Sequence, residues 1–127
     1  MFRDTRAFSG FAVPDTDAAK DFYGGTLGLE VTEEDDVLAL HIAGGRPVLI
    51  YPKPDHEPAT YTILNFPVED IDRAVDDLAA AGVEFESYTG ELETDEKGVF
   101  RKAGPPIAWF RDPAGNILAV LEDPDQA

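Results

Sequence analysis

Hydrophobic and polar residues alternate along residues 8–13 and again along residues 61–68, a pattern typical of half-buried β-strands. An aspartate follows each stretch, Asp15 and Asp70, where a helix N-cap would accept hydrogen bonds from free backbone N–H groups. After Asp70 the apolar residues recur every three or four positions and form one stripe: Ile71, Ala74, Val75, Leu78 and Ala81. The pattern after Asp15 is similar but less regular. Both stretches therefore predict a strand followed by a helix with one buried side.

Glycines mark the ends of both predicted helices, Gly28 and Gly82, because a positive φ costs least in glycine. Apolar runs then predict three further strands in each half, at residues 29–32, 37–42 and 47–51 and at residues 83–88, 107–111 and 117–121. A hairpin turn is expected at residues 43–46. The run Asp112-Pro-Ala-Gly-Asn116 predicts a turn rather than a functional motif, because Asp caps, Pro fixes φ, and Gly and Asn tolerate left-handed backbone. Each half thus has the predicted order β-α-β-β-β.

The two halves also share sequence. Residues 11–21 and 66–76 are identical at six of eleven positions, with a constant offset of 55. Residues 27–31 match residues 81–85 at an offset of 54, one residue shorter. Two matches in register indicate a duplicated module.

We therefore predict one α+β domain over residues 1–127, built from two tandem βαβββ modules. The first module covers residues 6–52, and the second covers residues 60–122. A polar, proline-rich linker at residues 53–59 joins them. Residues 89–104 are charged and weakly periodic, which predicts a long loop, and a loop of this length is often a lid over a site.

Composition limits the possible functions. The chain has no cysteine, so disulfides, thiolate metal sites and a cysteine nucleophile are excluded. No apolar run approaches the ~18 residues that span a bilayer, and the start of the chain lacks a signal-peptide pattern, so we expect a cytoplasmic protein. With 26 acidic against 10 basic residues the net charge is −16, which disfavours binding to nucleic acids or anionic membranes. The acidity fits either a high-salt habitat or an ordinary acidic cytosolic protein.

Two groups of residues form a recognisable pattern: Asp15, Phe22-Tyr23 and Leu27-Gly28-Leu29 in the first half, and Phe110-Arg-Asp112-Pro113-Ala-Gly115-Asn116-Ile-Leu in the second. Over roughly residues 7–122 the chain resembles the vicinal oxygen chelate superfamily, which includes glyoxalase I, bleomycin-resistance proteins and extradiol dioxygenases. The resemblance implies a curled mixed sheet around a concave cleft, with the helices on the outer face. It also implies a homodimer.

Metal-dependent members of this superfamily place four ligands, mostly His and Glu, on the first and last strands of each module. Their metal holds substrate oxygens and acts as a Lewis acid. The corresponding positions here are Phe8, Ile63, Ala119 and Leu49 or a direct neighbour of Leu49, and none of these side chains can bind a metal. The resemblance therefore implies the fold without its metal, and we expect neither a metal nor another cofactor.

His41 lies in a predicted strand and is the one candidate for a catalytic role, as a general base or hydrogen-bond donor in the cleft. The alternative is a structural strand histidine. His56 lies between Asp55 and Glu57 in the linker, and we interpret it as a solvated side chain.

Aromatic side chains at Phe8, Tyr51, Tyr61 and Trp109 would suit a flat apolar ligand, although aromatic residues in strands are also common core residues. Asn65 follows Ile63 by two positions, so it shares that face of the strand and would orient a ligand, unless it is a surface asparagine. The expected ligand-binding residues are Phe8, His41, Leu49, Tyr51, Ile63, Asn65, Trp109, Ala119 and Leu121.

The preferred hypothesis is a metal-free small-molecule-binding protein that sequesters an apolar or aromatic compound. An enzyme of the same superfamily (a lyase, isomerase or dioxygenase) is the alternative, either metal-free through His41 or metal-dependent through ligands at other positions. A regulatory module with an exposed sheet edge is a third possibility.

Overall fold

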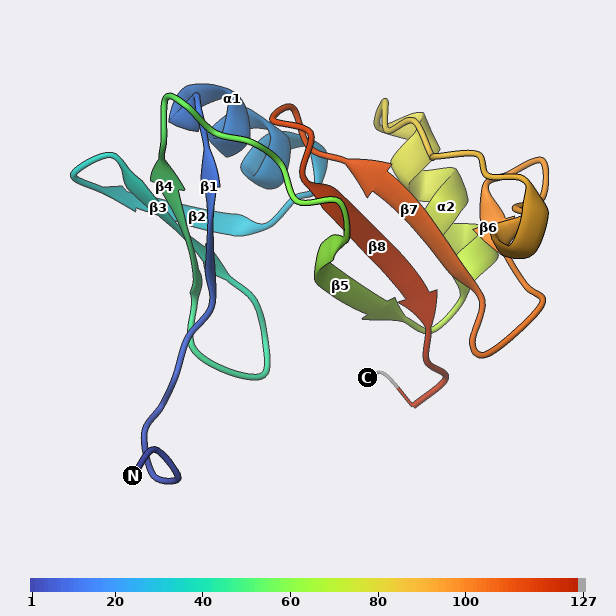
Figure 1. Cartoon of the computed structure of the whole chain (residues 1–127), viewed down its shortest axis with the longest axis horizontal. Helices are drawn as coiled ribbons and strands as arrows, with labels where there is room; N and C mark the ends of the chain where they lie inside the picture. The colour runs from blue at the N-terminus through green and yellow to red at the C-terminus, as the bar shows by residue number, and fades with distance from the viewer. Residues whose placement is uncertain (126–127) are drawn as a thin grey trace. The chain divides into compact units, whose positions relative to one another are not determined.

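The structure is a computed structural model that describes residues 1–125, and the chain divides into two compact units, Met1–Glu57 and Pro58–Ala127. Each unit contains a four-stranded mixed sheet with a helix packed against it (Figure 1). The strand orders are β1-β4-β3-β2 and β5-β8-β7-β6, so the same topology occurs twice. The α+β class and the repeated βαβββ-type architecture are therefore confirmed, as two separate sheets that are not closed.

Unit one begins with strand β1 and helix α1, followed by a π-helical turn and three strands. Their bounds are β1 Gly10–Val13, α1 Thr16–Lys20, the π-helical turn Asp21–Thr26, β2 Glu30–Glu34, β3 Val37–His41 and β4 Val48–Pro52. Strand β1 runs parallel to β4, and the other pairs are antiparallel. Helix α1 starts where expected, because the Asp15 carboxylate accepts hydrogen bonds from Asp17 N and Ala18 N at 2.9 and 3.2 Å.

The helix of unit one covers one face of its sheet. Tyr23 in the π-helical turn is fully buried, and its ring packs against Phe11 on β1 at a centroid distance of 5.8 Å. At the other edge Lys20 forms an ion pair with Glu33 on β2. The register places Phe11, Ile50, Leu38 and Glu33 in one row across the four strands, so this row belongs to the helix-covered face.

Unit two repeats this order with a longer first strand, helix and last strand and a shorter second strand. Their bounds are β5 Thr62–Val68, α2 Ile71–Ala80, a 3-10 turn Gly90–Leu92, β6 Val99–Phe100, β7 Ile107–Arg111 and β8 Ile117–Glu122. Asp70 caps α2 by accepting from Arg73 N, and Glu122 of β8 accepts from Ile71 N. These two carboxylates fix the start of α2 against its own sheet.

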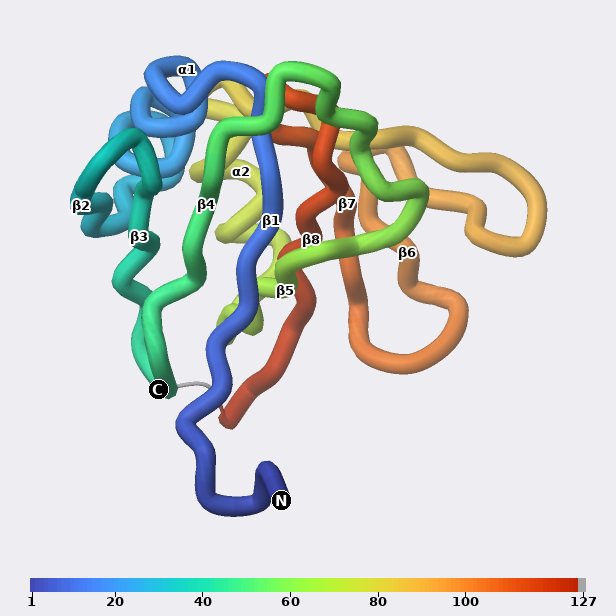
Figure 2. The backbone as a smooth tube through the Cα atoms, turned by 60° about the vertical axis from the view of Figure 1, so that its left-hand side comes forward, coloured from blue at the N-terminus to red at the C-terminus, as the bar shows by residue number. Residues whose placement is uncertain are grey.

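The segments that pair with the edge of β7 differ from the prediction. Residues 83–88 were expected to form a strand, but within the described residues they pair with β7 through only one isolated bridge, Phe85 with Phe110, in which Glu86 N donates to Trp109 O at 2.8 Å. Farther along β7, the two-residue strand β6 pairs with Ile107 and Ala108. Two short segments thus share one edge of β7, and Figure 2 follows the chain through both of them.

Strand β6 lies inside residues 89–104, which the sequence predicts as a structureless loop, so that prediction was wrong for this part. A strand of two residues is too short to produce a detectable alternation. The strand nevertheless belongs to the core, since Val99 and Phe100 are both buried.

The expected turn at Asp112–Asn116 is confirmed. The buried Asp112 carboxylate accepts from Ala114 N, Asn116 N and the Asn116 amide, and Gly115 has a φ of 88°. Both predicted helix-ending glycines, Gly28 and Gly82, also have positive φ. Within residues 1–125 no helix is long and apolar enough to cross a membrane.

Candidate functional site

The face of sheet one opposite the helix gathers several of the expected site residues. The register aligns Gly10, Leu49, Ala39 and Thr32 in one row across the four strands. Paired residues share a face and side chains alternate along a strand, so His41, two residues from Ala39, lies on this face as well. Tyr51, two residues from Leu49, does too. We call this surface the helix-free face of unit one.

His41 has a partner that the sequence did not reveal. Its Nε2 atom lies 2.8 Å from the Thr32 hydroxyl oxygen, and the two groups share a hydrogen bond. The residues lie diagonally across the β2–β3 pair, where Thr32 faces Ala39 and His41 faces Glu30. Only the register of the hairpin brings them together, so spacing along the chain gives no signal. The imidazole is half-buried on the helix-free face.

Phe8 lies just before β1, and its ring is 54% exposed. The Arg46 guanidinium stands 5.0 Å from the ring centroid, a cation–π arrangement, and its Nη1 donates to Arg6 O at 3.1 Å. The parallel ladder extends to this point, because Leu49 N donates to Ser9 O. Phe8 is therefore held at the end of the sheet and is accessible to a ligand.

The corresponding face of sheet two gathers the remaining expected residues. Asn65, Ala119 and Trp109 are directly paired across β5, β8 and β7, so their side chains share one face. Leu121 lies on the same face, two residues beyond Ala119. Helix α2 packs on the opposite face, which carries the buried side chains of Phe110, Leu118 and Val120. We call the first surface the helix-free face of unit two.

Trp109 is the centre of an aromatic wall, defined here as Tyr88, Phe100 and Trp109. The Tyr88 ring meets it edge-on at a centroid distance of 5.5 Å, and the Phe100 ring lies at 6.3 Å. Its indole Nε1 donates to the Thr62 hydroxyl at 3.1 Å. The paired N–H orders the indole. Trp109 and Tyr88 are half-buried whereas Phe100 is buried, so the first two rings form the accessible part of the wall.

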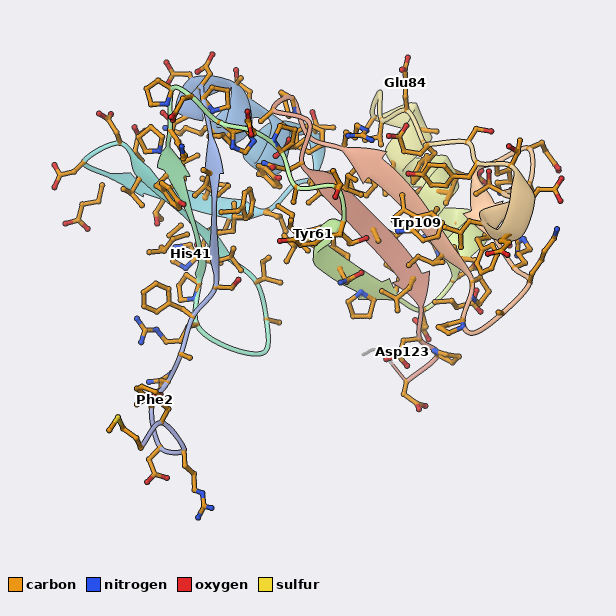
Figure 3. All side chains as sticks on the ribbon, in the orientation of Figure 1. Phe2, His41, Tyr61, Glu84, Trp109 and Asp123 are labelled. Atoms are coloured by element: carbon orange, nitrogen blue, oxygen red, sulfur yellow. The ribbon has the colours of Figure 1, made fainter. Side chains whose placement is uncertain are left out.

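The neighbours of Trp109 were not those expected. Tyr61, labelled with Trp109 in Figure 3, is 69% exposed just before β5. Tyr88 and Phe100 instead come from the segments that share the edge of β7. The sequence gives only a weak signal that these two residues flank Trp109, because Tyr88 lies at the end of an expected strand and Phe100 in an expected loop.

Three expected residues differ in how a ligand could reach them. Ile63 lies at a β-bulge, between Thr62 and Leu64, where the register shifts by one residue. Asn65 is exposed, as a residue that orients a ligand must be. Ala119 has no exposed surface, so it forms the floor between Asn65 and Trp109 rather than a direct contact.

The side chains at the four ligand positions do not fit the metal of the metal-dependent proteins that the chain resembles. Phe8, Leu49, Ile63 and Ala119 offer no nitrogen, oxygen or sulfur donor in their side chains. Across residues 1–125, no group of three or more His, Cys, Asp or Glu residues is placed to hold a metal ion.

His56 does not fit its interpretation as a solvated side chain. The residue is half-buried, and its Nε2 atom is shielded from solvent without a hydrogen-bond partner among the described residues. Its backbone N–H donates to Lys53 O, which closes a turn in the linker.

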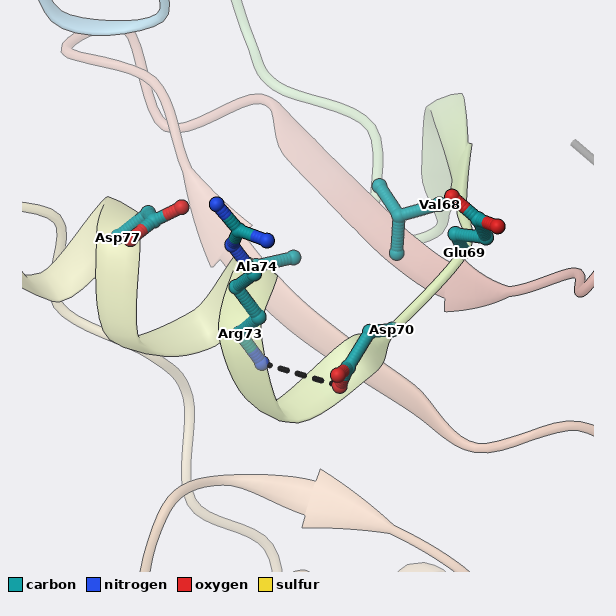
Figure 4. Close-up of a pocket in the computed structure, with 6 residues that line it drawn as sticks. All are labelled: Val68, Glu69, Asp70, Arg73, Ala74 and Asp77. Atoms are coloured by element: carbon teal, nitrogen blue, oxygen red, sulfur yellow. Dashed lines mark hydrogen bonds between the residues drawn. The ribbon is translucent and has the colours of Figure 1, made fainter. Parts of the chain in front are cut away.

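A surface hollow of about 490 Å³ lies at the start of α2 and contains none of the expected site residues (Figure 4). It is lined by Val68, Glu69, Asp70, Arg73, Ala74 and Asp77. Three carboxylates outnumber the single guanidinium, and the Asp70 carboxylate is already engaged as the helix cap. The hollow is thus poorly suited to an anion.

Comparisons with known proteins agree on the fold. TnmS3 from Streptomyces sp. CB03234, an antibiotic binding protein, has a TM-score of 0.70 at 20% identity, with 96% of this chain and 98% of that chain covered. A glyoxalase family protein from Enterococcus faecalis has a TM-score of 0.64 at 25% identity, covering 96% and 100%. Lactoylglutathione lyase from Agrobacterium tumefaciens has a TM-score of 0.66 at 20% identity, covering 95% of each chain.

A search of curated proteins finds no match. The sequence does match the profile of one superfamily over residues 7–120, which is most of its length. On that match, and with the βαβββ-type topology found in both units, the chain belongs to the Glyoxalase/Bleomycin resistance protein/Dioxygenase superfamily.

Proposed function

We propose that this protein binds an apolar or aromatic small molecule without a metal ion. One observation carries the proposal: the positions that would hold metal ligands are apolar, and an ordered aromatic wall lies beside one of them, Ala119. Such a surface contributes binding energy by burying apolar area and by stacking, with few polar groups to set orientation. The Thr62 hydroxyl accepts from the Trp109 indole, and Asn65 lies in the same row of the sheet as Ala119 and Trp109.

The fold by itself permits either binding or catalysis. It is shared with TnmS3, an antibiotic binding protein, and with a lactoylglutathione lyase. The side chains must therefore distinguish binding from catalysis, and their apolar character favours sequestration of a ligand.

The experiment is a thermal-shift and calorimetric screen of flat aromatic compounds, beginning with 2-naphthol. A ligand that binds only the native state raises the melting temperature, and the rise grows with the logarithm of the ligand concentration above the dissociation constant. Replacing Trp109 by Leu should weaken binding about 2- to 10-fold, the range for loss of aromatic stacking. Leu92→Ala is the matched control, because Leu92 is an exposed apolar residue of the same unit, outside the aromatic wall.

Metal content is measured on the same preparation. The protein is incubated with Fe, Mn, Co, Ni and Zn, desalted at moderate ionic strength to release ions held loosely by acidic side chains, and analysed by elemental mass spectrometry. We expect no retained metal. About one metal per chain would contradict the metal-free proposal and restore an oxygen-chelating enzyme.

One observation favours the alternative of a metal-free enzyme: the pairing of His41 with Thr32. A histidine oriented by a hydroxyl is equipped to move a proton near neutral pH. If the protein turns over a substrate, His41→Gln should lower kcat and remove one limb of the pH–rate profile, whereas Thr32→Val should shift that limb. Binding without turnover, unchanged by either substitution, would leave the sequestration proposal standing.

We also propose that two copies of the chain associate, as the resemblance implies. Light scattering coupled to size-exclusion chromatography would then give twice the chain mass of 13.8 kDa. A mass equal to one chain across the micromolar range would contradict the homodimer.

A further inference from the structure

We propose that an ion-pair network between α2 and residues 93–102 positions the aromatic wall, and that Arg101 and Lys97 are its positioning residues. The role in ligand binding rests on the proposed function. The role in ordering Trp109 does not, since it concerns the protein without a ligand.

The network joins two basic residues to three carboxylates. Lys97 Nζ lies 3.2 Å from Asp72 Oδ1 and 3.0 Å from Asp76 Oδ1. Arg101 reaches in two directions, with Nη2 2.7 Å from Asp72 Oδ1 and Nε 2.9 Å from Asp95 Oδ2. Asp72 and Asp76 belong to α2, so the network ties residues 95–101 to the helix.

Asp95 organises the same segment from within. Its Oδ1 accepts from Lys97 N and Val99 N, both at 2.9 Å, while its own backbone N–H donates to Val99 O. Gly98 completes this turn with a φ of 88°, and a Cβ there would come within 2.8 Å of the Phe85 Cβ. The turn is therefore compact, and its central residue Lys97 and the nearby Arg101 tie it to α2.

The segment held by the network also supplies the flanks of Trp109. Phe100 follows Val99 in β6 and contacts the indole. Tyr88, the other flank, is fixed through Thr94: Tyr88 N donates to the Thr94 hydroxyl at 2.9 Å, and Thr94 N donates to Tyr88 O at 3.0 Å. Displacing residues 93–102 would thus disturb both neighbours of the indole together.

The sheet alone holds this segment weakly, because β6 pairs with β7 over only two residues. The ion pairs lie at the surface, and the side chains of Lys97 and Arg101 are 30% and 41% exposed. Salt and substitution can therefore act on the network without opening the core.

The test compares Arg101→Glu with Arg73→Glu. Arg73 is an exposed residue of α2 and forms no ion pair within the part of the chain that the structure describes. Both variants replace an arginine by a glutamate, so they change the net charge equally. Trp109 is the only tryptophan of the chain, so acrylamide quenching of its emission reports on the aromatic wall alone. Quenching and near-ultraviolet circular dichroism are recorded without ligand, well below the melting temperature of each variant.

We expect Arg101→Glu to increase quenching and reduce the near-ultraviolet signal, with Arg73→Glu unchanged from the wild type. The dissociation constant for 2-naphthol should rise about 1.5- to 5-fold in Arg101→Glu alone, the range for a lost exposed ion pair. Arg101→Lys should recover part of the effect, because Lys keeps the charge but not the two-directional geometry.

A purely structural role predicts a different result: a lower melting temperature with quenching and affinity equal to those of Arg73→Glu, which would overturn the proposal. If Arg101→Glu does not fold, Arg101→Gln and Lys97→Gln give the same comparison against Arg73→Gln. If the wild type binds no aromatic compound, the proposed function fails, but the quenching comparison still decides whether the network orders Trp109.

Discussion

Asp35 and Asp36 form the two-residue loop of the β2–β3 hairpin, and both have positive φ, 53° and 68°. A two-residue hairpin with both central φ positive is usually built from Asn-Gly or Asp-Gly, since most side chains are disfavoured there. Here two adjacent carboxylates occupy it, next to Glu33 and Glu34. The hairpin therefore contains local strain that its sequence does not minimise.

We predict that Asp36→Gly stabilises the protein by about 0.5–1 kcal/mol, because glycine adopts the left-handed backbone without steric cost. Urea unfolding at neutral pH measures the change. Asp36→Ala removes the same charge but keeps a Cβ, so it should not stabilise. Equal gains from both variants would show that charge repulsion, not backbone conformation, dominates at this loop.

Residue-level expectations succeeded where the effect is local. The capping aspartates, the helix-ending glycines and the Asp112 turn all depend on hydrogen bonds or φ values within a few residues. The partners of His41 and Trp109 could not be predicted, because Thr32 and Thr62 reach them across strands. Whether the nine expected site residues bind a ligand stays a prediction, which the experiments above address.

At the scale of elements, the strongly periodic segments were predictable and the edge of β7 was not. Strand β7 occupies the expected residues 107–111, and α2 begins directly after its expected cap. The contacts of residues 83–88 and of β6 with β7 arise from tertiary packing, such as that of Phe85 against Phe110. Short edge segments of this kind have too few residues for a pattern to appear.

The ion-pair network makes an element-scale prediction about acid. Hydrogen bonds from Arg101, then Lys97, lower the pKa of Asp72. Partial burial alone would raise the pKa of Asp95, but hydrogen bonds from Val99 N, Arg101 and Lys97 N outweigh it and lower that pKa as well. A lowered folded-state pKa contributes stability above the unfolded value, about 3.9 for Asp, and this contribution is lost as the pH falls through the folded value.

Lowering the pH from 7 to 2 should therefore reduce the free energy of unfolding more in the wild type than in Arg101→Gln, with most of the loss between pH 5 and pH 2. The variant has less of this contribution to lose. Urea unfolding at several pH values measures it, with Arg73→Gln as the charge-matched control. Parallel profiles for wild type and Arg101→Gln would contradict a significant folded-state interaction of Arg101 with Asp72 and Asp95.

For the whole molecule, charge sets which ligands approach. The net charge of −16 creates a negative potential around the chain that attracts cations and repels anions over about a Debye length, ~8 Å at physiological ionic strength. Under the proposed function, the aromatic wall would select ring systems by their shape rather than by their charge. Shape selectivity and charge selectivity would then have separate origins.

A matched series of naphthalene derivatives separates the effect of ring shape from the effect of charge. At low salt we expect naphthalen-2-ylmethanamine, a cation, to bind more tightly than the neutral naphthalen-2-ylmethanol, and 2-naphthoate, an anion, to bind most weakly. The three affinities should converge at 1 M salt, where the Debye length is ~3 Å. Calorimetric titrations measure the order, and a preference that persists at high salt would point instead to a charged group in direct contact with the ligand.

The π-helical turn Asp21–Thr26 limits where the two halves of this chain can be cut and recombined. From capping aspartate to terminal glycine the first half is one residue longer, Asp15 to Gly28 against Asp70 to Gly82. The turn is closed by bonds of the type Leu27 N to Phe22 O, which span one residue more than an α-helical turn, so the extra residue is absorbed inside the helix. A graft that cuts through this helix would shift the following strand by one position and turn its apolar side chains to the wrong face. The interchangeable piece is the complete helix, from its aspartate to its glycine.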